Sequence, residues 1–362
     1  MTLRIAMAGV AVAGAVWGNM SGAVAGTFVY VSNADSREIS VLSLDERTGA
    51  LTPVATTPTK GAVMPLALSP DRRHLYASLR SEPYSVSTFA VDPATGTLTE
   101  QSTVKLPDNM AYLSTDATGR FLLSASYTGD KIAINPIGPD GLAGETPVQV
   151  VPTGKNAHAI RVDPANTHVL ASNLGSDVML QFRFDPASGQ VSPGTPPAVA
   201  TAKGAGPRHF VFSPDGRFVY GTNELDGTVN SYRYDAAAGT LALIGTVSAV
   251  PPDFKGGAPA TADIHLTPDG GLLYATERTS NTIAAYRVDA QTGALTPAGN
   301  FATETQPRGF AIDPLGRYLI AAGQKSGSAT IYAINPESGA LAPLGRQPLG
   351  KNPNWVEIVT LP

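Results

Sequence analysis

Residues 92–98 read DPATGTL and form one copy of a turn that recurs along the chain. The turn lies between two segments in which apolar and polar residues alternate, as they do in half-buried β-strands. Its glycine, Gly96, can supply the positive φ that a tight hairpin needs. The same turn and its variants place glycines at positions 49, 96, 141, 189, 239, 293 and 339. Seven hairpins of one kind predict seven copies of one supersecondary unit.

A second motif is offset from the first and is clearest in residues 213–220, SPDGRFVY. Versions of it occur around Pro70, Ala117, Pro164, Pro214, Pro268 and Pro314, at steps of 46 to 54 residues. This spacing is typical of a four-stranded propeller blade. No helical period competes with the alternation of period two.

The hairpin turn occurs seven times and the second motif only six times. The two counts agree if the seventh blade is formed by strands from both ends of the chain. Residues 353–358 have the form of an innermost strand with no successor, and residues 27–33 have the form of a second strand with no predecessor. Pairing them closes the ring and removes exposed sheet edges. We therefore predict an all-β, seven-bladed β-propeller over residues 26–362, closed by its N- and C-terminal strands.

The N-terminus has the pattern of a cleaved signal peptide over residues 1–25. Arg4 precedes an apolar stretch at residues 5–17, and Ala23-Val24-Ala25 has the A-x-A form of a cleavage site. A membrane anchor is the rival interpretation, but Gly18-Asn19 interrupts the stretch before the ~20 residues that a span requires. We expect a periplasmic or secreted protein with no membrane span after cleavage.

Composition excludes several functional classes. The 362 residues carry a net charge of −4 with no cluster of basic residues, so nucleic acid is not an expected partner. There is no cysteine, no phosphate-binding glycine loop, no metal-ligand spacing and no G-x-S-x-G nucleophile motif. We expect no metal and no cofactor, and the sequence leaves the oligomeric state open.

Aligning the blades predicts two rings of residues at one mouth of the central channel. The ring at the starts of the first strands contains Leu66, Tyr112, His158, Arg208, Asp263, Arg308 and Asn354. The ring just past the second strands contains Ala34, Arg80, Tyr127, Leu174, Glu224, Arg278 and Gln324. Both are rich in groups that a strand end does not need, which indicates a polar basin. The alternative is that these are only solvated loop residues.

Two further histidines lie near these rings. His209 follows Arg208, and strand alternation is expected to turn its side chain to the opposite face of the sheet. His265 lies two residues after Asp263. Either side chain could contact a residue of the basin and orient it.

Five motifs resemble the seven-bladed propeller lactonases, which include the bacterial 6-phosphogluconolactonases and, more distantly, the fungal carboxymuconate cyclases. They are residues 204–209 (GAGPRH), 223–225 (NEL), 262–265 (ADIH), 303–310 (TETQPRGF) and 318–325 (YLIAAGQK). The resemblance implies a metal-free site at the channel mouth that uses His158, Arg208, Glu224 and an arginine from Arg278 or Arg308. Residues 251–261 lack the tryptophan expected before Ala262, so the resemblance does not decide whether the substrate carries a phosphate.

These observations predict hydrolysis of a sugar-acid δ-lactone, either 6-phosphoglucono-1,5-lactone or glucono-1,5-lactone. Glu224 or His158 would activate a water molecule, and Arg208 would stabilise the oxyanion. The expected substrate-binding residues are Arg278, Arg308, Tyr127, Asp263, His209 and Gln324. Two alternatives are a muconate-type lactonising cycloisomerase and a non-enzymatic propeller that binds a protein or glycan outside the cytoplasm.

Overall fold

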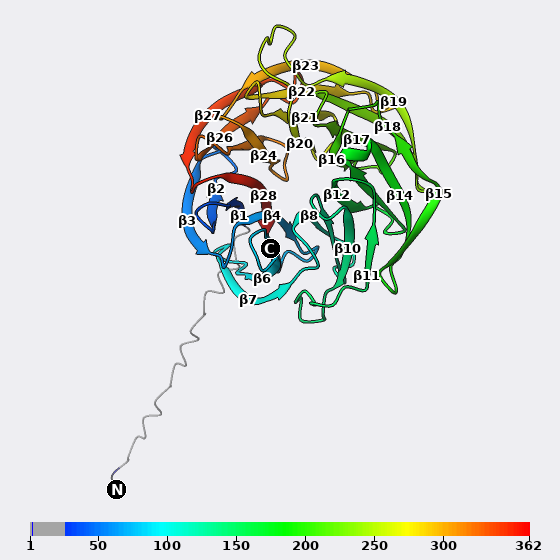
Figure 1. The fold of residues 1–362 in the computed structure, drawn as a ribbon. Helices are drawn as coiled ribbons and strands as arrows, with labels where there is room; N and C mark the ends of the chain where they lie inside the picture. Colours follow the sequence, from blue (N-terminus) through cyan, green and yellow to red (C-terminus); the bar gives the residue numbers. More distant parts are fainter. Residues whose placement is uncertain (1, 3–25) are drawn as a thin grey trace.

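The computed structural model describes Thr2 and residues 26–362, so the predicted signal peptide otherwise lies outside the described residues. Seven four-stranded antiparallel sheets surround a central channel (Figure 1). The predicted seven-bladed propeller is confirmed. One short 3-10 helix, η1 (Leu174–Ser176), interrupts the strands.

Within each blade the strands follow one another from the channel outward. The closing blade contains β28 (Pro353–Leu361), β1 (Gly26–Asn33), β2 (Glu38–Leu44) and β3 (Leu51–Pro58). The next two contain β4 (Val63–Leu68), β5 (His74–Leu79), β6 (Ser85–Val91) and β7 (Leu98–Lys105), then β8 (Met110–Thr115), β9 (Phe121–Ser126), β10 (Lys131–Pro136) and β11 (Gln149–Pro152).

The remaining four blades follow the same order. They contain β12 (Ala157–Val162), β13 (His168–Asn173), β14 (Val178–Asp185) and β15 (Gln190–Ala200), then β16 (Pro207–Phe212), β17 (Phe218–Asn223), β18 (Thr228–Asp235) and β19 (Thr240–Ser248). The last two contain β20 (Thr261–Leu266), β21 (Leu272–Glu277), β22 (Thr282–Val288) and β23 (Leu295–Ala302), then β24 (Pro307–Ile312), β25 (Tyr318–Gly323), β26 (Ser328–Ile334) and β27 (Leu341–Pro348).

The hairpin glycines join each blade to its neighbour. All seven have a positive φ, between 68° and 80°. At Gly239 an added Cβ would lie 2.1 Å from the His168 ring, so the turn packs directly on the preceding blade. Tyr76 donates a hydrogen bond to the carbonyl of Gly141 at 2.8 Å, and Tyr274 does the same to Gly339 at 3.0 Å. The motif that predicts the blades thus also holds them together.

The ring closes through the chain ends, as predicted. β1 pairs antiparallel with β28 from Gly26 opposite Leu361 to Asn33 opposite Pro353. Figure 1 shows the two strands side by side. Val29, Tyr30 and Val31 of β1 are completely buried, so this strand is part of the core.

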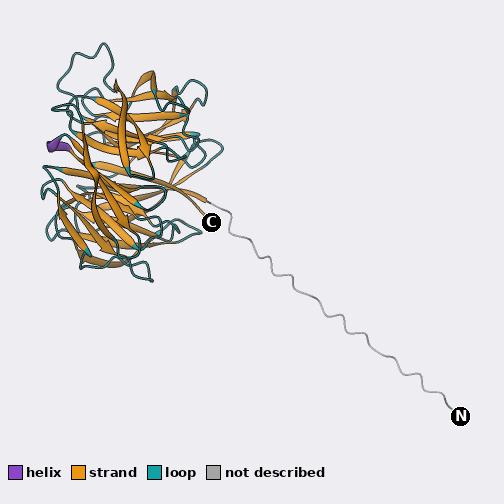
Figure 2. Ribbon diagram, turned by 90° about the vertical axis from the view of Figure 1, so that its right-hand side faces the viewer, coloured by secondary structure: helices purple, strands orange, loops and turns teal. Residues whose placement is uncertain are grey.

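The channel has two distinct ends because all seven inner strands run in the same direction. At one end the inner strands begin and the second strands finish, and η1 lies on this side. The C-terminus lies at the opposite side (Figure 2).

Within the described part of the chain, no helix has the length and apolar character needed to cross a membrane.

Candidate active site

A cavity of about 220 Å³ lies at the end of the channel where the inner strands begin. We call it the upper cavity. It is lined by Arg80, Ala111, Tyr127, His158, Glu224, Arg278 and Arg308. Arg80, Tyr127, Glu224 and Arg278 each directly follow a second strand, as the alignment predicted. The sequence analysis placed Arg80 in that ring but did not predict a catalytic or binding role for it.

A β-bulge at the start of the inner strands aims side chains into this cavity. In β12 the pairing with β13 shifts from Ala157 to Ala159, so His158 lies outside the ladder. Corresponding shifts occur beside Arg208 in β16 and Arg308 in β24. A bulge turns a side chain away from the regular alternation of its strand. Three charged or titratable residues are presented at the mouth in this way.

The register of the inner strands shows that the predicted first ring is wrong in three blades. Met64, Ala111 and Ala262 occupy the positions that the sequence assigned to Leu66, Tyr112 and Asp263. Turn spacing could not locate the bulge, so Tyr112 and Asp263 were placed one residue past these positions and Leu66 two residues past. A shift of one residue turns a side chain to the other face of the sheet. Asp263 lies deeper in the channel wall, and Gln324 donates a hydrogen bond to Asn352 at 2.9 Å. Neither lines the upper cavity.

Glu224 lies between two arginines. Arg208 Nε is 2.7 Å from Glu224 Oε2, and Arg278 Nη2 is 2.8 Å from Oε1. The first contact is an ion pair without a well-aligned hydrogen bond, whereas Arg208 Nη1 donates to the carbonyl of Ala262 at 2.7 Å. Burial alone would raise the pKa of Glu224, but the two guanidinium groups outweigh it and lower that pKa. Glu224 is therefore ionised, with both oxygens engaged.

The site carries an excess of positive charge. Arg80, Arg208, Arg278 and Arg308 against one carboxylate give a formal charge of +3, and Arg308 forms no ion pair with any described residue. Burial, followed by repulsion from Arg208, Arg278 and Arg80, lowers the pKa of Arg308 well below its usual value. An arginine does not lose its proton in proteins. An added anion would instead stabilise the crowded cations.

His158 is suited to accept a proton. Its side chain is 4% exposed, and its Nδ1 is buried with no hydrogen-bond partner among the described residues. Burial, followed by the charge of Arg208, lowers the pKa of His158 well below its usual value. The ring is therefore neutral and keeps a free lone pair.

His209 reaches the channel instead of turning away from it. Its Nδ1 is 2.8 Å from Asp263 Oδ1, and its ring centroid is 5.1 Å from that of His158. Tyr112 and Trp355 pack against it with centroids at 5.1 and 5.4 Å, so three rings meet across the channel. The bulge interrupts the simple alternation from which the sequence prediction was made. Trp355 was not predicted, because only the three-dimensional packing brings it to His209.

No group of three His, Cys, Asp or Glu side chains in the described residues is arranged to hold a metal ion. What the cavity offers is one neutral imidazole, one carboxylate held by arginines, and an excess of cationic donors. Such a set can accept a proton and stabilise an oxyanion or a bound anion.

Comparisons with known proteins show the family of the chain. The family model described as "Lactonase, 7-bladed beta-propeller" matches residues 23–358. A 6-phosphogluconolactonase from Pectobacterium carotovorum is 40% identical over 333 residues, which cover 92% of this chain and 98% of that protein. One from Serratia proteamaculans is 39% identical over 331 residues, covering 91% and 98%.

A solved structure, the periplasmic gluconolactonase of Pseudomonas aeruginosa, superposes with a TM-score of 0.86 at 27% identity and covers 93% of this chain and 100% of that one. The family match spans all seven blades, from the strand at the N-terminus to β28. The chain belongs to the seven-bladed β-propeller lactonase family.

Proposed function

We propose that the chain hydrolyses a sugar-acid δ-lactone in the upper cavity, with glucono-1,5-lactone and its 6-phosphate as candidate substrates. The observation that carries the proposal is a buried, neutral His158 beside a cluster of four arginines, with no partner for its Nδ1 among the described residues. Lactone opening needs a base for the attacking water and positive charge for the carbonyl oxygen as it becomes an oxyanion. Relatives at about 40% identity are named 6-phosphogluconolactonase.

Of the two candidate bases, the geometry favours His158. Both oxygens of Glu224 contact arginines, so neither is free to accept a proton from water. His158 Nδ1 has no hydrogen-bond partner among the described residues. In this mechanism Glu224 holds Arg208 and Arg278 in place, and the arginines stabilise the oxyanion.

Arg308 is the first candidate for an anionic part of the substrate. It lines the cavity without an ion-pair partner among the described residues, and Arg80 lies in the same wall. A guanidinium group can hold a phosphate or carboxylate through two parallel hydrogen bonds. The anion would be a 6-phosphate or the carboxylate of the product.

The test is turnover of glucono-1,5-lactone with and without the 6-phosphate by the purified chain that begins at residue 26, measured above the spontaneous rate. Arg308→Met should raise KM for the phosphorylated lactone at least tenfold if Arg308 holds the phosphate. Arg317→Met is a matched control, because Arg317 is half-exposed and pairs with Glu46 away from the cavity. If neither lactone is turned over, the proposal is wrong. Turnover of a muconate-type diacid instead would favour the cycloisomerase.

We also propose that the enzyme acts outside the cytoplasm. The support is the predicted signal peptide over residues 1–25 and the likeness to a periplasmic gluconolactonase. Cell fractionation followed by N-terminal sequencing should find a chain that begins at Gly26. An intact N-terminus in the cytoplasmic fraction would contradict export.

A further inference from the structure

A second cavity, of about 440 Å³, fills the channel on the other side of the rings of Tyr112, His209 and Trp355. We call it the lower cavity. Its wall includes His209, Asp263, His265, Trp355 and Glu357, none of which lines the upper cavity. His209 connects the two, because its ring lies in the lower wall and packs against His158 in the upper one.

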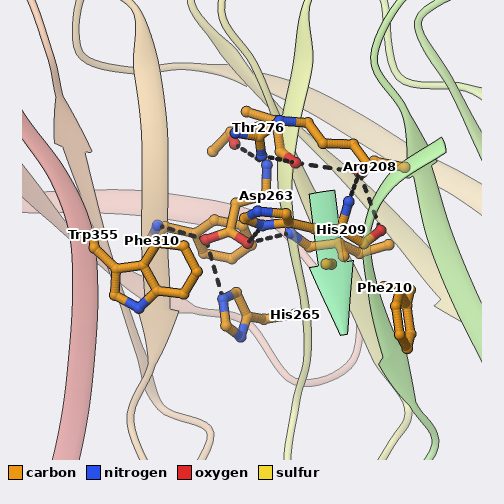
Figure 3. A network of polar contacts seen from close by, with 12 residues as sticks. Arg208, His209, Phe210, Asp263, His265, Thr276, Phe310 and Trp355 are labelled. Carbon is orange, nitrogen blue, oxygen red and sulfur yellow. Dashed lines mark hydrogen bonds and ion pairs between the residues drawn. The ribbon is translucent and has the colours of Figure 1, made fainter. Parts of the chain in front are cut away.

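Asp263 is held as an ionised carboxylate at this junction (Figure 3). It is 8% exposed, and the backbone N–H groups of Ile264 and Phe310 donate to it at 3.0 and 3.3 Å. His265 Nε2 lies 3.3 Å from its second oxygen. Burial alone would raise the pKa of Asp263, but His265 and His209 outweigh it and hold the pKa well below its usual value.

This carboxylate sets the tautomer of His209. An ionised carboxylate can only accept hydrogen bonds, so the 2.8 Å contact requires a proton on His209 Nδ1. A neutral imidazole carries one N–H, which leaves a lone pair on Nε2. The pKa of His209 is lowered to about 3, mainly by burial and next by Arg208, so the ring is neutral.

Two buried ring nitrogens without partners are thereby left on neighbouring imidazoles. His209 Nε2 and His158 Nδ1 are both buried with no partner among the described residues, and the two side chains are each 4% exposed. Their ring centroids are 5.1 Å apart, so the two rings are in contact. Buried polar atoms without a protein partner are typically satisfied by an ordered water molecule.

We propose that Asp263 and His209 form, with His158, a binding site for the water molecule that attacks the lactone. The inference rests on the lactonase function proposed above and adds the position of the nucleophile. The water donates one proton toward His209 Nε2 and the other toward His158 Nδ1. As its oxygen bonds to the lactone carbonyl carbon, His158 takes the proton. When the ring C–O bond breaks, that proton passes to the leaving oxygen, so the net reaction adds one water.

Asp263 is a positioning residue in this scheme, because it acts on the water only through His209. Asp263→Asn places an amide N–H opposite His209 Nδ1 and favours the opposite tautomer, with the proton on Nε2. His209 could then no longer accept a hydrogen bond from the water. We expect kcat to fall by about 10²- to 10⁴-fold with KM nearly unchanged.

Glu357→Gln is the matched control. Glu357 is a carboxylate of the same cavity, accepts a hydrogen bond from Trp355 at 2.8 Å, and forms no hydrogen bond with His209 among the described residues. Its amide keeps an acceptor for Trp355, so kcat should stay at the wild-type value. His209→Gln is a second variant that removes the imidazole itself, and it should lose as much activity as Asp263→Asn.

Nitrogen NMR of ¹⁵N-histidine-labelled protein reads the tautomer without substrate. The wild type should carry the His209 proton on Nδ1, and Asp263→Asn should carry it on Nε2. A wild-type enzyme that turns over lactone with His209 protonated on Nε2 overturns this inference and leaves the proposed function standing. So does wild-type kcat in folded Asp263→Asn or His209→Gln. A wild type that turns over neither lactone overturns the proposed function, whichever tautomer it shows.

Discussion

Replacing Glu224 by glutamine tests how the upper cavity is held together. The carboxylate pairs with Arg208, whose side chain is 1% exposed, and with Arg278, which is 12% exposed. Glutamine has nearly the same size but one acceptor oxygen and no charge, so it cannot satisfy both guanidinium groups. The formal charge of the cluster rises from +3 to +4.

The loss of stability expected for Glu224→Gln follows from the burial of the ion pair. Removing one partner of a buried ion pair costs about 3–5 kcal/mol. The Glu224 side chain is 21% exposed, so solvent screens part of the charge left on the arginines. We therefore expect Glu224→Gln to lower the free energy of unfolding by about 2–3 kcal/mol. With the usual unfolding entropy per residue, a domain of this length should melt about 3–4 °C lower. Displaced arginines should also reduce kcat/KM by about 10²-fold.

Differential scanning calorimetry and lactone kinetics, corrected for spontaneous hydrolysis, measure the two effects. Asp226→Asn is the matched control, because Asp226 is an exposed carboxylate two residues away that accepts a hydrogen bond from Thr228 and does not line the cavity. A wild-type melting temperature and kcat/KM in Glu224→Gln would refute the reasoning. A loss of kcat alone, with unchanged KM and stability, would make Glu224 the base in place of His158.

Three further predictions concern closure, metal and pH. Removing residues 26–33 deletes β1 and its buried Val29, Tyr30 and Val31, so the chain should melt far below the intact propeller; an equal melting temperature would contradict the closed ring. Lactonase activity should survive exhaustive chelation, and a loss that calcium or zinc restores would reveal a metal site. Because the pKa of His158 is lowered, its neutral form persists below pH 6.5, and the acidic limb of kcat/KM should lie below that pH; a midpoint at or above pH 6.5 would contradict the base assignment.

Prediction from the sequence was most successful where the signal is local. All seven hairpin glycines have the expected positive φ, and β28 and β1 pair as expected. The ring past the second strands was aligned correctly in every blade, because those strands end at a fixed distance from a recognisable turn. From that ring, Arg80, Tyr127, Glu224 and Arg278 line the upper cavity.

Prediction was weaker at the starts of the inner strands. A bulge of one residue decides which side chain enters the channel, and Leu66, Tyr112 and Asp263 were each assigned to a position that another residue holds. A bulge leaves no mark in a pattern of period two that is only six residues long.

The sequence by itself determined the repeat and the set of polar residues at its mouth, because turn chemistry and alternation act between residues close together in the chain. It also determined the closure of the ring, because the count of repeats left one strand unpaired at each end of the chain. Only the tertiary structure decided how those residues are paired. His209 and Asp263 lie 54 residues apart, as do Arg208 and Ala262, and each pair meets because neighbouring blades pack side by side around the channel. Contacts between blades depend on the register and burial of whole sheets, so the sequence alone did not reveal that Glu224 is held between Arg208 and Arg278. Nor did it reveal that the rings of His158 and His209 are in contact, each with one buried nitrogen that has no partner among the described residues.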